Sequence, residues 1–488
     1  MTPLPAISRA VATAGAAAGL LASVATAQAP RPGPSSGASR AASSIDIPFE
    51  RFTLPNGLTV VLSPDHSTPT VAVQVVYHVG SKNEVAGRTG FAHLFEHVMF
   101  TGSGHVPYGM HDRFTEGVGG SNNGNTWFDW TRYYETNPSN YLETALWLES
   151  DRMGFLLDSL NEAKFNAQRD IVQNERRQSY DNQPNGRDEE VIALAMYPKG
   201  HPYSWQTIGS MADLRAASVE DVKQFFRMYY APNNATLAIV GDFDPANARA
   251  LVTKYFGDLG RGPDITRPTV PPVTLTEEKR ITLEDRVQVP RLTIAWPTVS
   301  VHSADEPALV FLRDILGNSR TARVTKELVY DRQLAADVDA SHFAFEDAGQ
   351  FQLSLVPRPG HTLTELESAA DSIIARLKRV GPTAEEVRRV KAGQQATFIN
   401  GLQSNLGKAS QLALDETFFR DPSYSFRVRY PRAQAVTAAD IQRVARKYLT
   451  AKRVVLSNVP MGRTALASHA DRSTVVTDPF TERAETTP

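Results

Sequence analysis

Three residues whose types and spacing could perform chemistry are His93, Glu96 and His97, in the segment GFAHLFEHVMF. Two histidines four residues apart lie on one face of a helix, where both imidazole rings can bind the same metal ion. A glutamate beside them can reach a water molecule on that ion and act as a base. A solvated polar face is the alternative, but 11 histidines in 488 residues would produce only about 0.03 such patterns by chance. The spacing therefore favours a hydrolytic metal site.

The element that must position these residues is predicted to be an amphipathic helix. Its apolar residues follow the spacing i, i+3, i+4, i+7 and i+8, which is typical of a helix that buries one face in a core. The two histidines and the glutamate would then lie on the opposite face. The apolar stripe consists of Phe91, Leu94, Phe95, Val98 and Met99.

A hydrolytic zinc site usually has three protein ligands and one position open for water, so a third ligand must come from elsewhere in the chain. Residues 165–180 have helical spacing, which places Glu175 on the same stripe as Val172. A carboxylate on a buried face needs a partner. That partner is either a metal ion or one of the neighbouring arginines, Arg176 and Arg177, and the spacing alone leaves both open.

Proline-rich and polar segments predict how the chain is divided. Four prolines within residues 260–272 exclude a helix interior or a central strand. We therefore expect an interdomain linker at 261–275, between an N-terminal domain at 45–260 and a C-terminal domain at 276–462. The apolar pattern ends near Met461, so residues 463–488 are expected to form a flexible tail.

The N-terminal residues are typical of an export signal. Residues 1–27 contain Arg9, an apolar run rich in alanine and glycine, and small residues at 25–27, which predicts a cleaved signal peptide. Residues 28–44 are mostly proline, glycine, serine and alanine, and we expect a disordered linker there. The apolar run is too short for a membrane span. The protein is therefore expected to be exported, either periplasmic or secreted, with no membrane span.

The composition excludes several classes of protein. Hydrophobic residues make up 41% and charged residues 21%, as in soluble globular proteins. The formal net charge is −2, so nucleic acid is not an expected partner. The chain contains no cysteine, which excludes disulfides, thiolate metal ligands and a cysteine nucleophile.

Two parts of the chain repeat each other at an offset of 219 residues. Residues 218–240 and 437–456 each predict a helix, a turn and a strand, and the same offset lays the alternating segment 72–77 over 291–296. In the first copy, Asn56-Gly57 between two strand-like runs predicts a hairpin. The fold class is therefore predicted to be α+β. We expect two homologous α/β-sandwich domains, each a mixed, largely antiparallel sheet with helices packed on it.

The second copy lacks metal-binding side chains at the corresponding positions. The offset places Leu312, Ile315 and Leu316 where the first copy has its two histidines and glutamate. These apolar side chains cannot bind zinc. We expect the second copy to be metal-free and to bind substrate or close over the site.

A family resemblance is carried by the motif His93-Leu94-Phe95-Glu96-His97 together with Glu175, with 77 residues between His97 and Glu175. This set resembles the inverted zinc motif (HxxEH) of the pitrilysin and mitochondrial processing peptidase family. The resemblance extends over residues 45–459, in the short two-domain form. Further matching segments are Gly80-Ser81, Glu84, Phe100-Thr101-Gly102, Leu142-Glu143, Asp151-Arg152-Met153 and the run Tyr229-Tyr230-Ala231-Pro232-Asn233-Asn234.

The resemblance implies a zinc-dependent endopeptidase that acts on peptides or unfolded polypeptide segments. It assigns one zinc ion per chain to His93, His97 and Glu175, and it makes Glu96 the general base. It also implies that the chain is half of a clam-shell dimer. Asn123 matches an edge-strand asparagine that holds the substrate backbone in this family, whereas a turn residue in a glycine-rich loop is an equal alternative.

The sequence departs from the family pattern at two places. Gln168 stands where the family commonly has a second acidic residue. The family also uses an arginine and a tyrosine of the C-terminal domain to bind substrate. Arg323 is a candidate for the arginine, but Asp337 stands near the expected tyrosine position. We therefore expect an Arg/Tyr pair from a partner chain, in a homodimer or in a heterodimer with a non-catalytic paralogue.

A second function class stays open beside the endopeptidase. Some relatives of this family are non-catalytic peptide-holding or assembly subunits, and such relatives usually lack part of the metal set. All four members of the set are present in this chain, which favours an enzyme.

Overall fold

The computed structural model describes residues 45–267, 270 and 272–476. The signal peptide predicted at 1–27 and the linker predicted at 28–44 lie outside the described residues. The described residues from Ile45 onwards form one compact unit by their internal contacts. Within the described part of the chain, no helix combines the length and the apolar character that crossing a bilayer requires.

The first sheet, sheet A, has six strands in the order β1-β2-β6-β3-β5-β4. All neighbouring strands are antiparallel except β2 and β6, which are parallel. The predicted hairpin at Asn56-Gly57 joins β1 to β2, and Gly57 adopts the positive φ of 95° that this turn requires. The strands are β1 Glu50–Thr53, β2 Thr59–Pro64, β3 Thr70–Tyr77, β4 Ser121–Thr126, β5 Thr131–Pro138 and β6 Ala235–Gly241.

The second sheet, sheet B, repeats this arrangement. Its order is β12-β7-β11-β8-β10-β9, with β12 in the place that β1 occupies in sheet A. Both sheets are mixed and largely antiparallel, as the sequence predicted. The strands are β7 Lys279–Asp285, β8 Arg291–Thr298, β9 Ala335–Ala344, β10 Gly349–Pro357, β11 Val454–Pro460 and β12 Thr474–Val476.

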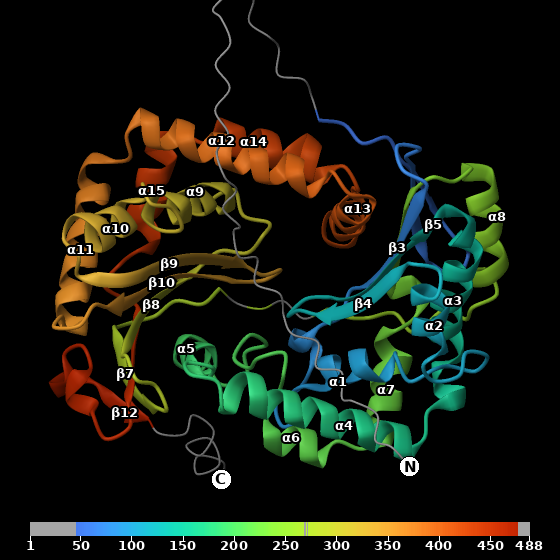
Figure 1. The fold of residues 1–488 in the computed structure, drawn as a ribbon, viewed down its shortest axis with the longest axis horizontal. Coiled ribbons are helices and arrows are strands. Elements are labelled where there is room, and N and C mark those ends of the chain that lie inside the picture. Colours follow the sequence, from blue (N-terminus) through green and yellow to red (C-terminus); the bar gives the residue numbers. More distant parts are fainter. Residues whose placement is uncertain (1–44, 268–269, 271, 477–488) are drawn as a thin grey trace, which may run out of the picture. The chain divides into compact units, whose positions relative to one another are not determined.

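In each copy two α-helices precede the paired strands β4–β5 or β9–β10 and five follow them before β6 or β11, whereas α8 has no counterpart in the described part of the second copy (Figure 1). The aligned helices α7 and α15 both begin with a capping box, which is formed by Ser218 with Asp221 and by Thr437 with Asp440. The prediction of two related α+β copies is therefore confirmed.

The α-helices are α1 Phe91–Val98, α2 Met110–Glu116, α3 Leu142–Ser159, α4 Glu162–Arg176, α5 Asp188–Met196, α6 Met211–Ala216, α7 Val219–Tyr229, α8 Pro245–Phe256, α9 Glu306–Leu316, α10 Arg323–Thr325, α11 Leu363–Val380, α12 Ala384–Gly401, α13 Asn405–Phe419, α14 Tyr430–Ala435 and α15 Ala438–Tyr448. Three π-helical segments follow α4, α10 and α13, at Arg177–Asp181, Lys326–Asp331 and Ser425–Arg429. Short 3₁₀ segments lie at Ser81–Asn83, Ser139–Tyr141, Pro232–Asn234, Thr464–Leu466 and Ala470–Arg472.

One helix from each copy packs on the sheet of the other copy. One face of sheet A packs in a core with α1, α3, α7 and α8, and its opposite face packs on α13 from the second copy (Figure 1). In return, α5 from the first copy packs on sheet B. Successive residues of a strand point to opposite faces of the sheet, and consecutive residues in these strands are apolar. Both faces are therefore apolar, and each must be packed against helices. The packing of α5 and α13 on the opposite sheets joins the two copies through buried surface. The domain boundaries predicted at 260 and 276 stay a prediction.

The flexible tail predicted for residues 463–488 is wrong for residues 463–476. Strand β12 pairs in parallel with β7, so that Thr474 lies opposite Ile281. Before it, the backbone N–H of Ser468 donates to Ser457 Oγ at 3.0 Å, and the Ser468 hydroxyl donates to the carboxylate of Glu367. Polar contacts of this kind leave no apolar pattern in the sequence, which explains the error. Residues 477–488 lie outside the described part.

Candidate metal centre

Helix α1 forms as predicted, with its apolar face in the core of the first copy. Phe91, Leu94, Phe95 and Val98 are buried there, and this leaves the two histidines and Glu96 on the opposite, half-buried face. The helix therefore has only one orientation that buries its apolar stripe, and that orientation fixes where its polar side chains point.

The start of α1 is fixed by a buried carboxylate and a glycine. Glu84 accepts hydrogen bonds from the backbone N–H groups of Gly90 at 2.9 Å and Ala92 at 2.8 Å, which are free donors at a helix N-terminus. Gly90 has a φ of 88°, and a Cβ there would lie 2.7 Å from the carbonyl oxygen of Ile208. A residue with a side chain at position 90 would shift α1 and the side chains that it carries.

Glu175, on α4, lies beside both histidines of α1. The Nε2 atoms of His93 and His97 are 3.3 Å apart, and Glu175 Oε2 lies 3.5 Å from His97 Nε2 and 3.7 Å from His93 Nε2. Ligand bonds of 2.0–2.2 Å to tetrahedral zinc place neighbouring ligand atoms about 3.4 Å apart. The three atoms thus have the spacing of three corners of a tetrahedral zinc site.

The protonation of these groups suits a metal ion. Burial, with the nearby His97, lowers the pKa of His93 to about 4, so its ring is neutral at pH 7. The hydrogen bond with His97 lowers the pKa of Glu175, which is therefore ionised. A neutral imidazole and an ionised carboxylate are ligands that zinc prefers.

The arginines next to Glu175 have other partners. Arg176 is buried and pairs with Glu190, with 2.6 Å between Nη1 and Oε1. Arg177 donates from Nη1 to Asn174 Oδ1 at 2.5 Å. The arginines therefore do not serve as the partner of Glu175. The structure instead places its carboxylate beside the two histidines, as a shared metal ion would require. Helix α4 continues directly into the π-helical segment at Arg177–Asp181, a rare form that often lies at functional sites.

Glu96 lies between the metal centre and the edge of sheet A. Its Oε2 accepts a hydrogen bond of 2.6 Å from the hydroxyl of Thr126, the last residue of β4. Burial raises the pKa of Glu96, and the hydrogen bonds from Thr126 partly oppose that rise. Sequence reasoning missed Thr126, because its contact with Glu96 depends on how β4 packs against α1.

Comparison with known proteins agrees with this geometry. A family model described as Insulinase (Peptidase family M16) matches residues 59–203, and one described as Peptidase M16 inactive domain matches residues 216–394. A zinc protease of Helicobacter pylori, PqqE, is 30% identical over 371 residues, which cover 75% of this chain and 82% of that protein. This chain belongs to peptidase family M16.

Two further relatives extend the comparison within family M16. A probable mitochondrial-processing peptidase subunit beta of Arabidopsis thaliana is 23% identical over 428 residues, which cover 83% of this chain and 77% of that protein. The crystal structure of a protease from Helicobacter pylori superimposes with a TM-score of 0.79 at 29% identity, over 85% of this chain and 100% of that chain. The resemblance to the pitrilysin and mitochondrial processing peptidase family is therefore confirmed.

Asn123 lies in strand β4 of this M16 chain, so the alternative of a turn residue is wrong. In sheet A, β4 pairs with β5 alone and forms the edge, with Asn123 opposite Tyr134. The side chain of Asn123 is exposed, and its Oδ1 accepts from the N–H of Gly124 at 2.9 Å. The outer main-chain groups of an edge strand remain available to another strand.

Arg323 is bound within the second copy and does not join the metal centre. Its Nε and Nη2 each donate to the carboxylate of Glu386 at 2.7 Å, and Nη2 also donates to the carbonyl oxygen of Gly381. Asp337 lies on β9 opposite Val356. Gln168 is buried on α4, two helical turns before Glu175.

The positions that correspond to His93, Glu96 and His97 in the second copy lie in α9. Leu312, Ile315 and Leu316 are fully buried in the core of that copy, so this face of α9 packs against apolar side chains. Within the described residues, the only other histidine and carboxylate group close enough to hold an ion is His111, Glu135 and Glu149.

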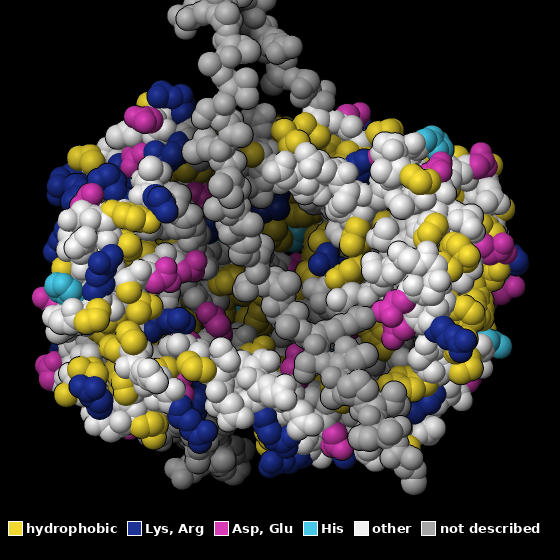
Figure 2. All heavy atoms as spheres, viewed as in Figure 1, with side chains coloured by type: hydrophobic (Ala, Val, Ile, Leu, Met, Phe, Trp, Pro, Cys, Tyr) yellow, Lys and Arg dark blue, Asp and Glu magenta, His cyan; other side chains and the backbone are white. Residues whose placement is uncertain are grey.

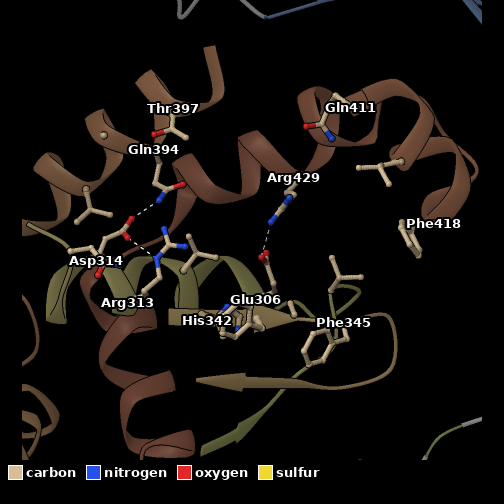
Figure 3. Close-up of a pocket in the computed structure, with 18 of the residues that line it drawn as sticks. Glu306, Arg313, Asp314, His342, Phe345, Gln394, Thr397, Gln411, Phe418 and Arg429 are labelled. Atoms are coloured by element: carbon tan, nitrogen blue, oxygen red, sulfur yellow. Dashed lines mark hydrogen bonds and ion pairs between the residues drawn. The ribbon is translucent and has the colours of Figure 1, made fainter. Parts of the chain in front are cut away.

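Trp127, the residue after Thr126, lines a cavity of about 780 Å³. Trp127 and Trp130, in the turn after β4, line it together with residues of the second copy, but the three proposed metal ligands do not. In Figure 3, Arg429 points toward Glu306, with which it is paired, and His342 on β9 and Phe345 just after that strand also line the cavity. Figure 2 shows a hollow near the centre of one face, with hydrophobic, acidic and basic side chains around it.

The geometry predicts that Glu175 is needed to bind zinc. Replacing it with glutamine removes an anionic ligand and should lower the zinc content by about one ion per chain, measured by mass spectrometry after dialysis at limiting free zinc. Glu162→Gln, at the exposed start of the same helix, is the matched control and should keep the wild-type content. Equal zinc contents in the two variants would contradict the assignment of Glu175.

Proposed function

We propose that this M16 chain is a zinc-dependent endopeptidase that hydrolyses peptides or unfolded polypeptide segments. The observation that carries the proposal is the convergence of two imidazole nitrogens and one carboxylate oxygen at 3.3–3.7 Å, which is the spacing of three ligand atoms around zinc. The name zinc protease of its Helicobacter pylori relative supports the same activity.

In this proposal, His93, His97 and Glu175 hold one zinc ion. A zinc ion in such a site acidifies a water molecule and polarises the carbonyl group of the bond to be cleaved. Glu96 accepts the proton of the attacking water and returns it to the leaving amine. Thr126 holds Glu96 by a 2.6 Å hydrogen bond, so the carboxylate keeps one orientation through both proton transfers.

The edge strand β4 supplies the binding surface for an extended peptide. Its outer main-chain groups can pair with a peptide that adds as a further strand, and Asn123 is exposed on this strand to bind the peptide backbone. Thr126, at the end of β4, contacts Glu96, so a peptide along this edge would reach the base. Only an extended chain can pair in this way, which favours peptides and unfolded segments over folded proteins.

The chain is proposed to act as half of a clam-shell dimer. Arg323 is engaged by Glu386 in the second copy, so it is not free to bind substrate at the metal centre. We infer that a partner chain supplies the Arg/Tyr pair, either a second copy or a non-catalytic paralogue. The predicted signal peptide makes the assembly an exported one, periplasmic or secreted.

A second candidate function is a non-catalytic peptide-holding or assembly subunit. The description of the family model over residues 216–394 as an inactive domain favours a binding role for the second copy. The complete set of His93, Glu96, His97 and Glu175 favours catalysis by the first copy.

Replacing Glu96 with glutamine separates these two functions. It should lower kcat by at least about 10³-fold and leave the zinc content unchanged, because it removes the base and keeps the three ligands. Cleavage of a quenched peptide library measures this, with Glu162→Gln as the control. A wild-type chain that binds zinc and cleaves no peptide, even with its co-purifying partner, would support the holding role instead.

Thr126 is predicted to act as a positioning residue for Glu96. Thr126→Val should lower kcat about 10- to 100-fold with little change in KM, since it removes a hydrogen bond to a charged group. Thr126→Ser keeps the hydroxyl and should restore most of the rate. If valine and serine lower kcat equally, the hydroxyl has no role in holding Glu96.

A further inference from the structure

A second group of metal-binding side chains lies behind the strands β4 and β5. His111 on α2, Glu135 on β5 and Glu149 on α3 each offer one ligand atom, and these atoms all lie within 4.8 Å of one another. The three residues come from different elements that are adjacent in the fold. None of them belongs to the centre formed by α1 and α4.

The ring of His111 is buried without a protein partner among the described residues. Only 7% of the residue is exposed, and neither Nδ1 nor Nε2 makes a hydrogen bond there. A buried polar atom left without a hydrogen-bond partner destabilises the folded state. Burial, with the nearby Arg152, lowers the pKa of His111 well below its ordinary value, so the ring is neutral. A neutral imidazole with a free lone pair is the form that binds metal ions.

The two carboxylates of the group carry more negative charge than their surroundings balance. Glu135 and Glu149 are fully buried, and the guanidinium of Arg152 pairs with Glu149 through Nε at 2.9 Å and through Nη2. Glu135 Oε2 accepts from Asn137 Nδ2 at 2.7 Å, whereas Glu135 Oε1 has no partner among the described residues. One excess negative charge in a protein interior needs a proton or a cation.

We propose that His111, Glu135 and Glu149 form a second site, which binds a structural divalent transition-metal ion such as zinc. One imidazole and two carboxylates suit zinc better than magnesium or calcium, which prefer oxygen ligands alone. Each carboxylate oxygen has two lone pairs, so Glu149 can bind the ion and keep its pair with Arg152. The ion neutralises the excess charge and gives Oε1 of Glu135 and one nitrogen of His111 the partners that they lack.

Binding at this site requires a small movement and the loss of one proton. Separations of up to 4.8 Å must shorten towards the spacing of about 3.4 Å around zinc when the ion binds. Burial, with the neighbouring Glu149, raises the pKa of Glu135 to about 8, so the metal-free group keeps a proton there at pH 7. The incoming ion replaces that proton.

The position of this second site indicates a structural role. The ion would tie α2, β5 and α3 together directly behind β4, the edge strand that carries Asn123 and Thr126. Its three ligands are almost fully buried, so a substrate has no access to it. The ring of Phe100, two residues after α1, lies 6.3 Å from the ring of His111, so this group packs close to the end of that helix.

Zinc stoichiometry of the full chain tests the second site. After chelation and reloading with zinc, the wild type should hold about two ions per chain by mass spectrometry. The double variant H93A/H97A and the single variant His111→Gln should each hold one, and the triple variant should hold none. His66→Gln, at an exposed histidine paired with Asp242, is the matched control and should keep two. An H93A/H97A variant that binds no zinc would overturn the proposal.

A measurement on the wild type keeps the test decisive if His111→Gln fails to fold. Crystals of the zinc-loaded chain, measured at the zinc absorption edge, should show an anomalous peak between His111, Glu135 and Glu149. A water molecule at that position, without an anomalous signal, would overturn the second site. That outcome would leave the first centre and the proposed peptidase untouched, because the two sites share no ligand.

Discussion

The whole site depends on how one short helix buries its apolar stripe. Helix α1 has Phe91, Leu94, Phe95 and Val98 on the side that enters the core, and its start is fixed by Glu84. Once that face is buried, the polar face points at α4, and the two imidazoles meet the carboxylate of Glu175. A helix rotated by one residue, about 100°, would remove both histidines from α4 and expose apolar rings to water. Packing and chemistry therefore select the same orientation.

The duplicated fold shows how the same scaffold serves two purposes. Sheets A and B share one strand order, and α9 has the place in the second copy that α1 has in the first. Leucine and isoleucine replace the polar triad in α9, so this helix is buried and adds packing where α1 presents two imidazoles and a carboxylate. The exchange of α5 and α13 then joins the copy with the ligands to the copy without them. The two copies are thereby linked by buried surface on both sheets as well as by the chain.

Local patterns in the sequence predicted those features that depend on local spacing. The amphipathic helix at the motif, the Asn-Gly hairpin and the repeat at an offset of 219 residues all follow from periodicity or turn chemistry. Glu175 needed more than spacing, because a buried carboxylate can pair with an arginine as well as with a metal ion. Features that depend on tertiary packing were not predictable. The contact of Thr126 with Glu96, the exchange of α5 and α13, and the pairing of β12 with β7 leave no local signal. Arg323 was misplaced for the same reason, since its partner Glu386 lies 63 residues further along the chain.

The central claim is that peptide hydrolysis depends on an ion bound by two histidines of α1 and one glutamate of α4. Titration of the metal-free chain with zinc tests it most directly, with peptide cleavage and bound zinc followed together. The account predicts that the metal-free chain is inactive, that cleavage returns in proportion to zinc bound at this centre, and that Glu175→Gln does not recover under the same conditions. Cleavage that persists after complete removal of zinc, or that recovers equally in Glu175→Gln, would contradict it.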